Sequence, residues 1–319
     1  MSLESFENRA MLLKLETVEN TDAAPTATAN AFQLMNGRSG LQADSIKRQL
    51  DRPFFGGDPS TPVNIRGFIE GEVEMVGALT PGQPSPLSPL LQVCGMAETL
   101  VTSPAPALAR YNVISRGIPS ASSYFFHAGT LKKLLGARGN LSGLAYEIGK
   151  TYTAKLRLEG NCIDVEEDDL PSDLDYDAFV EPMPYTTEYG ELKVNGFNVD
   201  GISLSVDFGN ELAVKQHTEA RIARISDRKP TFTVRFYRPA HANLNAWALW
   251  KSRTILPIVA SVGIGAGAGR GVRTLLRAQI VEPPQEVEHE KDTAVEIKGE
   301  LVPSSSGNDE LVFEFLTLP

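Results

Sequence analysis

The side chains best suited to chemistry in this sequence are two cysteines, four histidines and three alternating glutamates. Cys94 and Cys162 are too few for a disulfide framework or a cysteine-based zinc site. The histidines are scattered without the spacing of metal ligands, and no G-x-S-x-G, H-E-x-x-H or G-x-x-x-x-G-K-[ST] motif occurs. We therefore expect no enzymatic activity, no cofactor and no bound metal.

The three glutamates, Glu70, Glu72 and Glu74, lie at alternate positions of residues 63–75, where apolar residues hold most of the other positions. Alternate side chains of a strand share one face, so the segment is predicted to be a half-buried strand with a carboxylate-rich face. Such carboxylates could form an acid–base pair or a metal site, but no histidine accompanies them. A solvated face is the favoured interpretation.

A glycine-rich stretch, residues 263–268 (GIGAGA), fits the G-x-G-x-x-A pattern that brings a backbone close to a dinucleotide pyrophosphate. That pattern requires a strand followed by a helix, whereas residues 270–281 fit a strand at least as well as a helix. We therefore predict a flexible loop at a hairpin tip, without a nucleotide.

Alternation of apolar and polar residues along most of the chain predicts an all-β protein. The clearest alternating segments are residues 63–75, 151–159, 202–208, 232–236, 295–301 and 311–315. Two short helices are also expected. One covers residues 88–99, with Ser88 as its N-cap and Pro89 in its first turn. The other covers residues 243–251, with Trp247 and Trp250 on its inward face.

The stretch 164–177 is rich in Asp and Glu, contains one proline and has no basic residue. Such a composition predicts a solvated linker. We accordingly expect an N-terminal β-domain over residues 1–163, an acidic linker over 164–195 and a C-terminal β-domain over 196–319. A shift of 139 residues aligns the alternation and the terminal glycine of the two halves, for example Gly160 with Gly299. An internal duplication is therefore favoured over a chance likeness of two β-domains.

Composition narrows the class of protein further. The chain has 319 residues and a formal net charge of −10, which makes it a poor binder of nucleic-acid phosphates. No apolar stretch approaches the roughly 18 residues of a membrane-spanning helix, and the first ten residues lack the pattern of a signal peptide. We expect a soluble protein made in a reducing compartment.

Several sequence blocks, in their order along the chain, resemble the tail tube (major tail) proteins of siphophages, the bacteriophages with long non-contractile tails. The blocks are residues 12–17 (LLKLET), 21–26 (TDAAPT), 48–57 (RQLDRPFFGG), 90–99 (LLQVCGMAET), 133–140 (KLLGARGN), 158–160 (LEG), 208–210 (FGN), 225–230 (ISDRKP) and 307–311 (GNDEL). The resemblance spans nearly the whole chain and depends on the number and order of the blocks, since none is a chemical motif. The acidic stretch 164–177 and residues 270–276 (RGVRTLL) depart from the family pattern.

The resemblance implies two β-sandwich or barrel-like tail-tube domains, each with one short flanking helix. It implies a virion structural protein that self-assembles into stacked rings, forming the hollow tube through which phage DNA passes into the host during DNA ejection. Expected partners are copies of the chain and other tail proteins at the tube ends, with no tight DNA binding and no membrane. The expected location is the virion tail, and the host cytoplasm during assembly.

Within such a tube, carboxylates on the lumen face would repel DNA phosphates, so Glu70, Glu72 and Glu74 are predicted to face the lumen. An outer solvated face is the alternative for them. Loops at residues 53–62, 80–89 and 263–271 are candidates for contact with the next ring. Their candidate contact residues are Phe54, Phe55, Gly265, Gly267 and Gly269.

Trp247 and Trp250 are either core anchors or residues of a subunit interface. If the chain is duplicated, three copies supply six similar units and close a pseudo-sixfold homotrimer; otherwise a homohexamer closes the ring. The trimer is favoured. The alternative class is a non-enzymatic β-sandwich adhesin or surface-binding module, which would present exposed aromatic platforms, yet aromatic residues make up a modest 8% of the chain.

Overall fold

The computed structural model describes residues 8–48, 50–216, 221–267 and 270–318. These residues contain twenty strands and three short helices, and every pairing between two named strands is antiparallel. The all-β class predicted from the alternation is confirmed.

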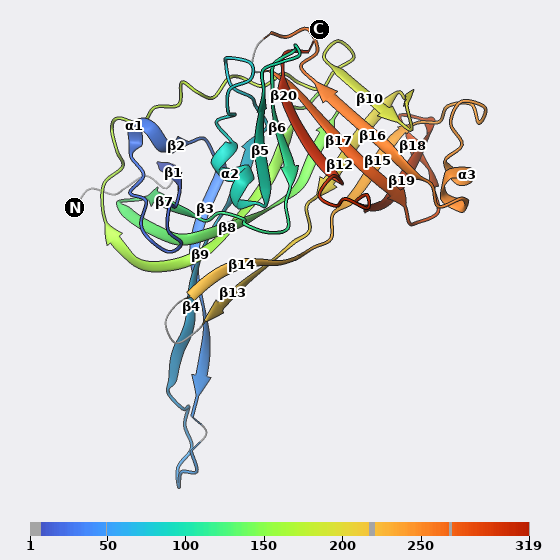
Figure 1. Ribbon diagram of the computed structural model, residues 1–319. Coiled ribbons are helices and arrows are strands. Elements are labelled where there is room, and N and C mark those ends of the chain that lie inside the picture. Colours follow the sequence, from blue (N-terminus) through green and yellow to red (C-terminus); the bar gives the residue numbers. More distant parts are fainter. Residues whose placement is uncertain (1–7, 49, 217–220, 268–269, 319) are drawn as a thin grey trace.

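Eight strands form a sheet that crosses the molecule from one side to the other, which we call the long sheet (Figure 1). In pairing order its strands are β3 (Met35–Lys47), β4 (Ser60–Glu74), β9 (Thr153–Glu167), β8 (Thr130–Glu147), β12 (Gly201–Asp207), β15 (Thr231–Tyr237), β19 (Asp292–Leu301) and β18 (Gln285–His289). The first four strands belong to the first half of the chain and the last four to the second. The two halves meet where β8 pairs with β12.

Seven strands form the second sheet, in which the halves meet again where β6 pairs with β20. In pairing order they are β5 (Met96–Val101), β6 (Leu108–Val113), β20 (Leu311–Leu316), β17 (Gly271–Ile280), β16 (Ile255–Val262), β10 (Gly190–Val194) and β11 (Phe197–Asn198). The end of β17 also pairs with β19, so the two sheets are continuous there.

The remaining strands extend the first half. β2 (Ala31–Phe32), β1 (Arg9–Leu15) and β7 (Ala121–His127) pair in that order, and β7 pairs with the first part of β8. β13 (Asn210–Gln216) and β14 (Arg221–Arg228) form a separate hairpin. Strand β8 is therefore shared, because its first part continues towards β7 and its last part towards β12.

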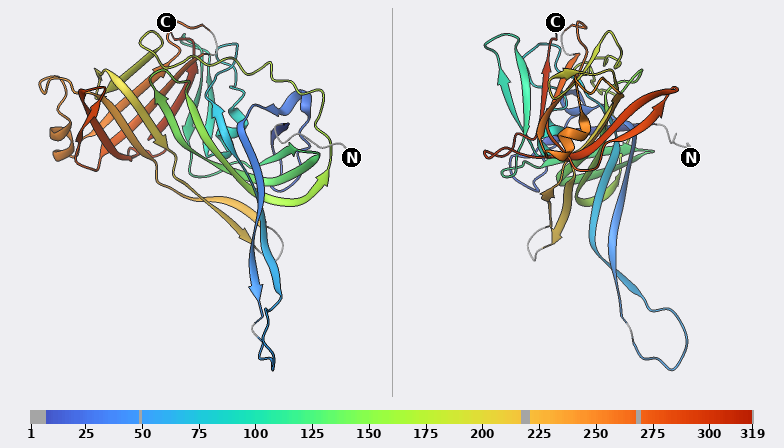
Figure 2. Two further views of the ribbon diagram at one scale, coloured as in Figure 1. Left: turned by 180° about the vertical axis from the view of Figure 1, so that it is seen from behind. Right: turned by 90° about the vertical axis from the view of Figure 1, so that its right-hand side faces the viewer.

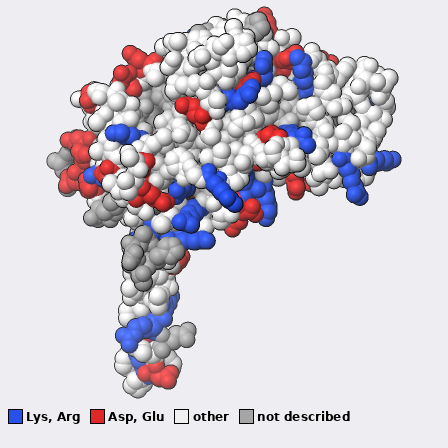
Figure 3. Space-filling model, in the orientation of Figure 1, with Lys and Arg blue, Asp and Glu red and all other residues white. Residues whose placement is uncertain are grey.

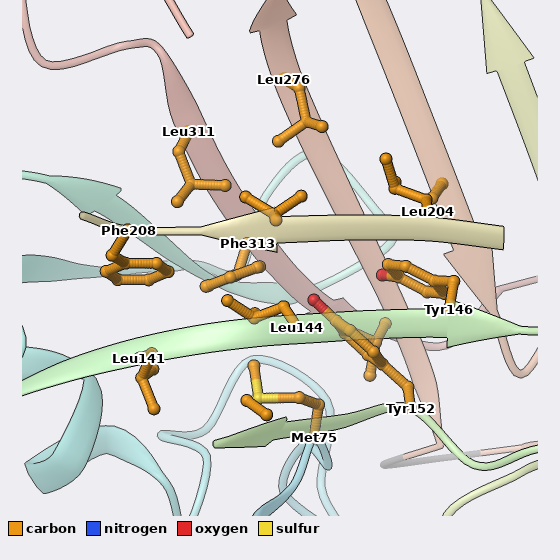
Figure 4. Packing of buried hydrophobic residues seen from close by; sticks show 14 of the residues in the cluster. Met75, Leu141, Leu144, Tyr146, Tyr152, Leu204, Phe208, Leu276, Leu311 and Phe313 are labelled. Atoms are coloured by element: carbon orange, nitrogen blue, oxygen red, sulfur yellow. The ribbon is translucent and has the colours of Figure 1, made fainter. Parts of the chain in front are cut away.

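The core lies between the sheets, and residues of both halves fill it (Figure 4). Phe208 stacks on Phe313 with 5.9 Å between the ring centroids. Tyr146 stacks on Tyr152, and both hydroxyls lie within hydrogen-bond distance of the Thr274 hydroxyl, at 2.7 and 3.2 Å. Burial raises the pKa of both phenols, so the pair stays neutral. The apolar positions of the alternating segments account for this core.

The helices are shorter than predicted. The expected helix over residues 88–99 is α2 (Ser88–Val93), and the prediction that it reaches Thr99 is wrong. It ends at Val93 with Cys94 as its C-cap, and Gly95 follows with a φ of +87° that favours glycine. Strand β5 begins at the next residue. The residue at the N-cap position is Leu87 rather than Ser88. The other helices are α1 (Ala27–Asn30) and α3 (Ala246–Lys251).

The Asn245 side chain caps α3 by accepting a hydrogen bond from the Ala248 amide. This cap places the helix start three residues later than the predicted range of residues 243–251.

A long hairpin, which we call the arm, is formed by β3 and β4 with the loop between them and extends away from the body (Figures 1 and 2). The part near the body is half-buried, whereas most side chains of residues 43–62 are exposed. The β13–β14 hairpin leaves the body on the same side but is shorter. Arg221 of β14 donates to the Ile65 carbonyl of the arm at 3.1 Å, so the two hairpins touch near the arm's base.

The same pairing order occurs in each half of the chain. β1 lies between β2 and β7, as β10 lies between β11 and β16. β4 lies between β3 and β9, as β15 lies between β12 and β19. The loop of the arm separates β3 from β4, the β13–β14 hairpin separates β12 from β15, and a short helix follows β4 and β15 in turn.

The acidic segment forms a shorter connection than predicted. Strand β9 continues to Glu167 because Thr130 and its neighbours in β8 pair with it, and β10 begins at Gly190. The expected linker over residues 164–195 is therefore reduced to residues 168–189. This segment runs back along the first half, where the Phe179 ring packs edge-on against Phe32 at 5.6 Å. The division into two β-domains stays a prediction.

Candidate functional site

The face of the long sheet that points away from the core is polar, and we call it the polar face. Strand register places its side chains on one side. They include Arg38 of β3, Phe68, Glu70, Glu72 and Glu74 of β4, Thr153, Lys155, Arg157 and Glu159 of β9, Arg138, Asn140, Ala145 and Glu147 of β8, Ser203, Ser205 and Asp207 of β12, Thr231, Thr233 and Arg235 of β15, and Glu296, Lys298 and Glu300 of β19. The three predicted glutamates thus share one face, which crosses both halves.

Glu70 is held between two arginines. Arg157 of β9 forms an ion pair with it, and Arg38 of β3 lies 2.6 Å from the same carboxylate. Arg157 also lies 2.6 Å from Glu159 and packs over the Phe68 ring. Partial burial disfavours the charged arginine, but Glu159 and Glu70 outweigh it and hold the pKa of Arg157 above its usual value. The carboxylate-rich face predicted from β4 is therefore neutralised in part by its neighbours.

The other two glutamates of β4 have different surroundings. In the strand register, Glu72 lies between Met35 and Lys155. For Glu74, partial burial, followed by the charge of Glu181, raises the pKa of the carboxyl, and a hydrogen bond with Thr151 opposes the shift. The three carboxylates therefore do not act as one uniform patch of negative charge.

A second ion-paired cluster lies on the polar face in the other half of the chain. Glu296 forms an ion pair with Arg235 of β15 and lies 3.0 Å from the Lys298 ammonium. Burial disfavours its charged form, but the hydrogen bonds and charges of Lys298 and Arg235 outweigh it, so the pKa of Glu296 is lowered. Both halves therefore place a carboxylate against basic side chains on this face.

The tip of the arm exposes two aromatic side chains. Phe54 is 65% exposed and Phe55 is fully exposed, while the Arg52 guanidinium lies 6.0 Å from the centre of the Phe54 ring. Arg52 also lies 3.2 Å from Asp58 across the loop. Exposed aromatic side chains at the end of an extended hairpin are typical of contact surfaces.

The glycine-rich stretch forms the loop of the β16–β17 hairpin, as predicted, and a strand rather than a helix follows it. The fingerprint for a dinucleotide therefore lacks its structural context. Gly265 and Gly267 have φ values of +69° and +94°, with open space around them. Gly269 lies outside the described residues. Contact of this loop with a second ring stays a prediction.

The two tryptophans are half-buried and pack against the core from α3. The indole nitrogen of Trp250 donates to the Val281 carbonyl at 3.2 Å, which ties α3 to the segment after β17. Trp247 lies beside the His241 ring. These contacts agree with the role of core anchors, and the alternative role at a subunit interface stays a prediction.

Two buried carboxylates that the sequence did not reveal, Glu310 and Glu314, form ion pairs near the boundary between the two halves. Glu314 of β20 is contacted by Arg110 of β6 at 2.5 Å and by Arg273 of β17 at 3.4 Å. Glu310 lies 2.9 Å from Arg228, and both side chains have little solvent access. The sequence signal is a charged residue within an apolar strand, as for Glu314, or directly before one, as for Glu310. The same pattern is also typical of surface positions.

Charged side chains are mixed over most of the surface seen in Figure 3, with acidic atoms gathered where β9 ends. Among the described residues, no group of three histidines, cysteines or carboxylates is placed to hold a metal ion. Within those same residues, no helix has the length and apolar content to cross a membrane. Both cysteines are free thiols, and burial raises the pKa of Cys94.

Comparison with known proteins adds no family assignment. The chain matches no protein-family model, and a search of curated proteins finds no match.

Proposed function

We propose that the protein is the subunit of a self-assembling tube, the tail tube of a bacteriophage with a long non-contractile tail. The observation that carries this proposal is the long sheet, which packs its inner face on the core and turns a polar face outward. Its two end strands, β3 and β18, each pair on one side within the described residues. Copies that continue such a sheet sideways would form a wall and remove its free edges.

The polar face suits a channel that conducts DNA without binding it tightly. Basic side chains hold DNA in proportion to the counterions that they release. On this face Arg157 and Arg38 are engaged by Glu70, and Arg235 by Glu296. A DNA phosphate would have to displace these carboxylates, so we propose that this face lines the lumen, with Glu70, Glu72 and Glu74 among its residues.

The repeated pairing order supports a duplicated chain. β3, β4 and β9 pair as β12, β15 and β19 do, and a short helix follows β4 and β15 in turn. Three such chains would supply six similar units around a pseudo-sixfold ring, so a homotrimer is favoured over a homohexamer.

Stacking of rings is assigned to the arm and to the β16–β17 loop. The arm extends beyond the body and exposes Phe54 and Phe55, which would bury their rings in a second ring. The proposal also includes other tail proteins at the tube ends, assembly in the host cytoplasm and a final place in the virion tail.

Negative-stain electron microscopy of the purified chain at increasing concentration tests the proposal. Rings or hollow tubes are expected, and counting chains per ring by native mass spectrometry distinguishes three from six. A protein that stays strictly monomeric at high concentration, with no polymer after long incubation, contradicts the proposal.

The exposed aromatic tip also supports an adhesin, the second candidate function. In that case Phe54 and Phe55 would contact a host-surface carbohydrate. Glycan-array binding by a chain that does not polymerise, lost when both residues are replaced by serine, would favour the adhesin over the tube.

A further inference from the structure

We propose that copies of the chain join head to tail by pairing β18 of one copy with β3 of the next, in the register that β8 and β12 use inside the chain. This inference rests on the proposed self-assembly and names the two strand edges that carry it. The partner is a second copy of this chain.

The model for the joint is already present within the chain. β8 and β12 pair at their last and middle residues, with Leu144 opposite Val206 and Tyr146 opposite Leu204. The side chains of these four residues are at most 1% exposed, so the joint is sealed by the core behind it. One half of this molecule therefore binds the other by continuing the long sheet.

The two end strands of the long sheet, β3 and β18, each have one edge that pairs with no other strand of the described residues. Within the described residues, β3 pairs only with β4, and β18 only with β19. β3 is 13 residues long and exposes Leu41 by 48% and Ile46 by 59%. Monomeric proteins usually protect long unpaired strand edges, because such edges pair with other chains.

The pairing order identifies which edge fits which. β3 lies beside β4 as β12 lies beside β15, so β3 offers the kind of edge that β12 offers to β8. At the other end, β18 precedes β19 and pairs with it, as β8 precedes β9 and pairs with it. The long sheet of one chain therefore ends in β18, which corresponds to β8, and in β3, which corresponds to β12.

A residue register follows from two glycines. Gly160 of β9 is opposite Gly67, which is opposite Leu41, while Gly299 of β19 is opposite Phe232, which is opposite Val206. Leu41 thus holds the place of Val206 in the other half.

The partner position is found in the same way. Ala145 is opposite Thr153, which lies seven residues before Gly160. His289 is opposite Asp292, which lies seven residues before Gly299, so His289 holds the place of Ala145. Glu288 therefore holds the place of Leu144. Because Leu144 is opposite Val206, Glu288 of one copy is expected opposite Leu41 of the next.

Head-to-tail pairing uses two different patches, so the contact propagates around a ring rather than ending at a dimer. In such a ring each chain would make the same kind of joint twice, once internally and once with its neighbour. The wall would then be one uninterrupted antiparallel sheet.

Cysteine cross-linking tests the contact. The natural cysteines are buried, so Leu41→Cys and Glu288→Cys introduce the accessible thiols. Cβ atoms of directly opposite residues lie close enough for a disulfide under mild oxidation. An equal mixture of the two single variants is expected to give a covalent dimer, and each variant alone is expected to give none. The double variant is expected to give a ladder of covalent oligomers whose largest member contains as many chains as one ring.

The matched control pairs Glu288→Cys with Ile46→Cys, which lies on the same strand about 17 Å from position 41 and should not link. Dimers of Leu41→Cys alone would mean a two-fold contact between β3 edges and would overturn the inference. Tubes that form normally without the 41–288 link, or with a stronger 46–288 link, would overturn it while leaving the proposed tube intact. Failure of the unmodified chain to associate would contradict both proposals.

Discussion

The buried carboxylates at the boundary between the halves are balanced by specific arginines. Glu310 lies against Arg228, and Glu314 lies against Arg110 and Arg273. A charge with little solvent access is tolerated because its partner compensates the lost hydration, so removing one partner leaves the other uncompensated. These residues therefore matter to stability more than the exposed ion pairs do.

Replacing Glu310 by Gln is expected to lower the free energy of unfolding by about 3 kcal/mol, because Arg228 would remain buried without its counter-charge. Urea denaturation followed by circular dichroism measures this loss. The exposed Glu282→Gln variant is the control and should change stability by less than about 0.5 kcal/mol. Adding Arg228→Met to Glu310→Gln should recover part of the lost stability. A double variant that is less stable than Glu310→Gln would contradict the pairing.

The raised pKa of Glu74 predicts a pH dependence. The folded protein holds this proton more tightly than the unfolded chain, whose value is near 4.5, so the associated stability is present below that pH and is lost as pH rises through the folded pKa. Glu74→Gln, which mimics the protonated form, should equal the unmodified protein near pH 3.5 and exceed it at pH 7. The gain is expected to be below about 1 kcal/mol, because the carboxyl is partly exposed.

Paired urea titrations at the two pH values measure the difference, with Glu72→Gln as the matched substitution on the same strand. An advantage of Glu74→Gln that is largest in acid would mean that burial does not raise the pKa.

At the scale of elements, the arm differs from every other strand pair, because its far part has no core to pack on. Its side-chain contacts include the hydrogen bond from Asn64 to Asp44 and the ion pairs of Arg66 with Asp44 and Arg52 with Asp58. Elements with few buried contacts open locally at small cost in free energy. The arm can therefore change its contacts without disturbing the fold.

Replacing Phe54 and Phe55 together by Ser is expected to leave the midpoint of urea unfolding unchanged, since both rings are solvated in the chain itself. The same variant should stop tube growth at single rings, which electron microscopy and sedimentation velocity would detect. Val18→Ser, at another exposed apolar position, is the control and should form tubes of normal length. Full-length tubes from the double variant would exclude the tip from stacking.

Much of the secondary structure could be predicted because alternation is a local signal. The strand over residues 63–75 is confirmed with Ile69 and Val73 fully buried, and the glutamates between them lie on the other face. The helix end was missed although Gly95 was visible in the sequence, because apolar spacing continues through the strand that follows. Arg157 was missed as the partner of Glu70 because the two are 87 residues apart and only the sheet register brings them together.

At the scale of the whole molecule, the two halves share one core and two sheets, so neither can lose its structure without exposing apolar surface of the other. We expect a single cooperative unfolding transition. Trp247 and Trp250 are the only tryptophans and both lie in the second half, so fluorescence reports that half alone. Its transition should coincide with the far-ultraviolet dichroism of the whole chain.

Separate midpoints for the two signals would instead mean two independent domains, as the acidic linker suggested. The matched comparison is a variant that weakens the joint, Leu204→Ala, whose buried side chain faces Tyr146 across the two halves. It should lower the free energy of unfolding by about 2–5 kcal/mol and shift the midpoints of both signals together.

Strand β8 has a mechanical consequence. Its 18 residues run unbroken past β7, β9 and β12, so a twist applied to one half is transmitted to the other through a single covalent backbone. A wall made of such chains would resist flattening around its circumference. Bending of the proposed tube would then have to occur between successive rings, and the arms would keep neighbouring rings in contact as the spacing between them changes.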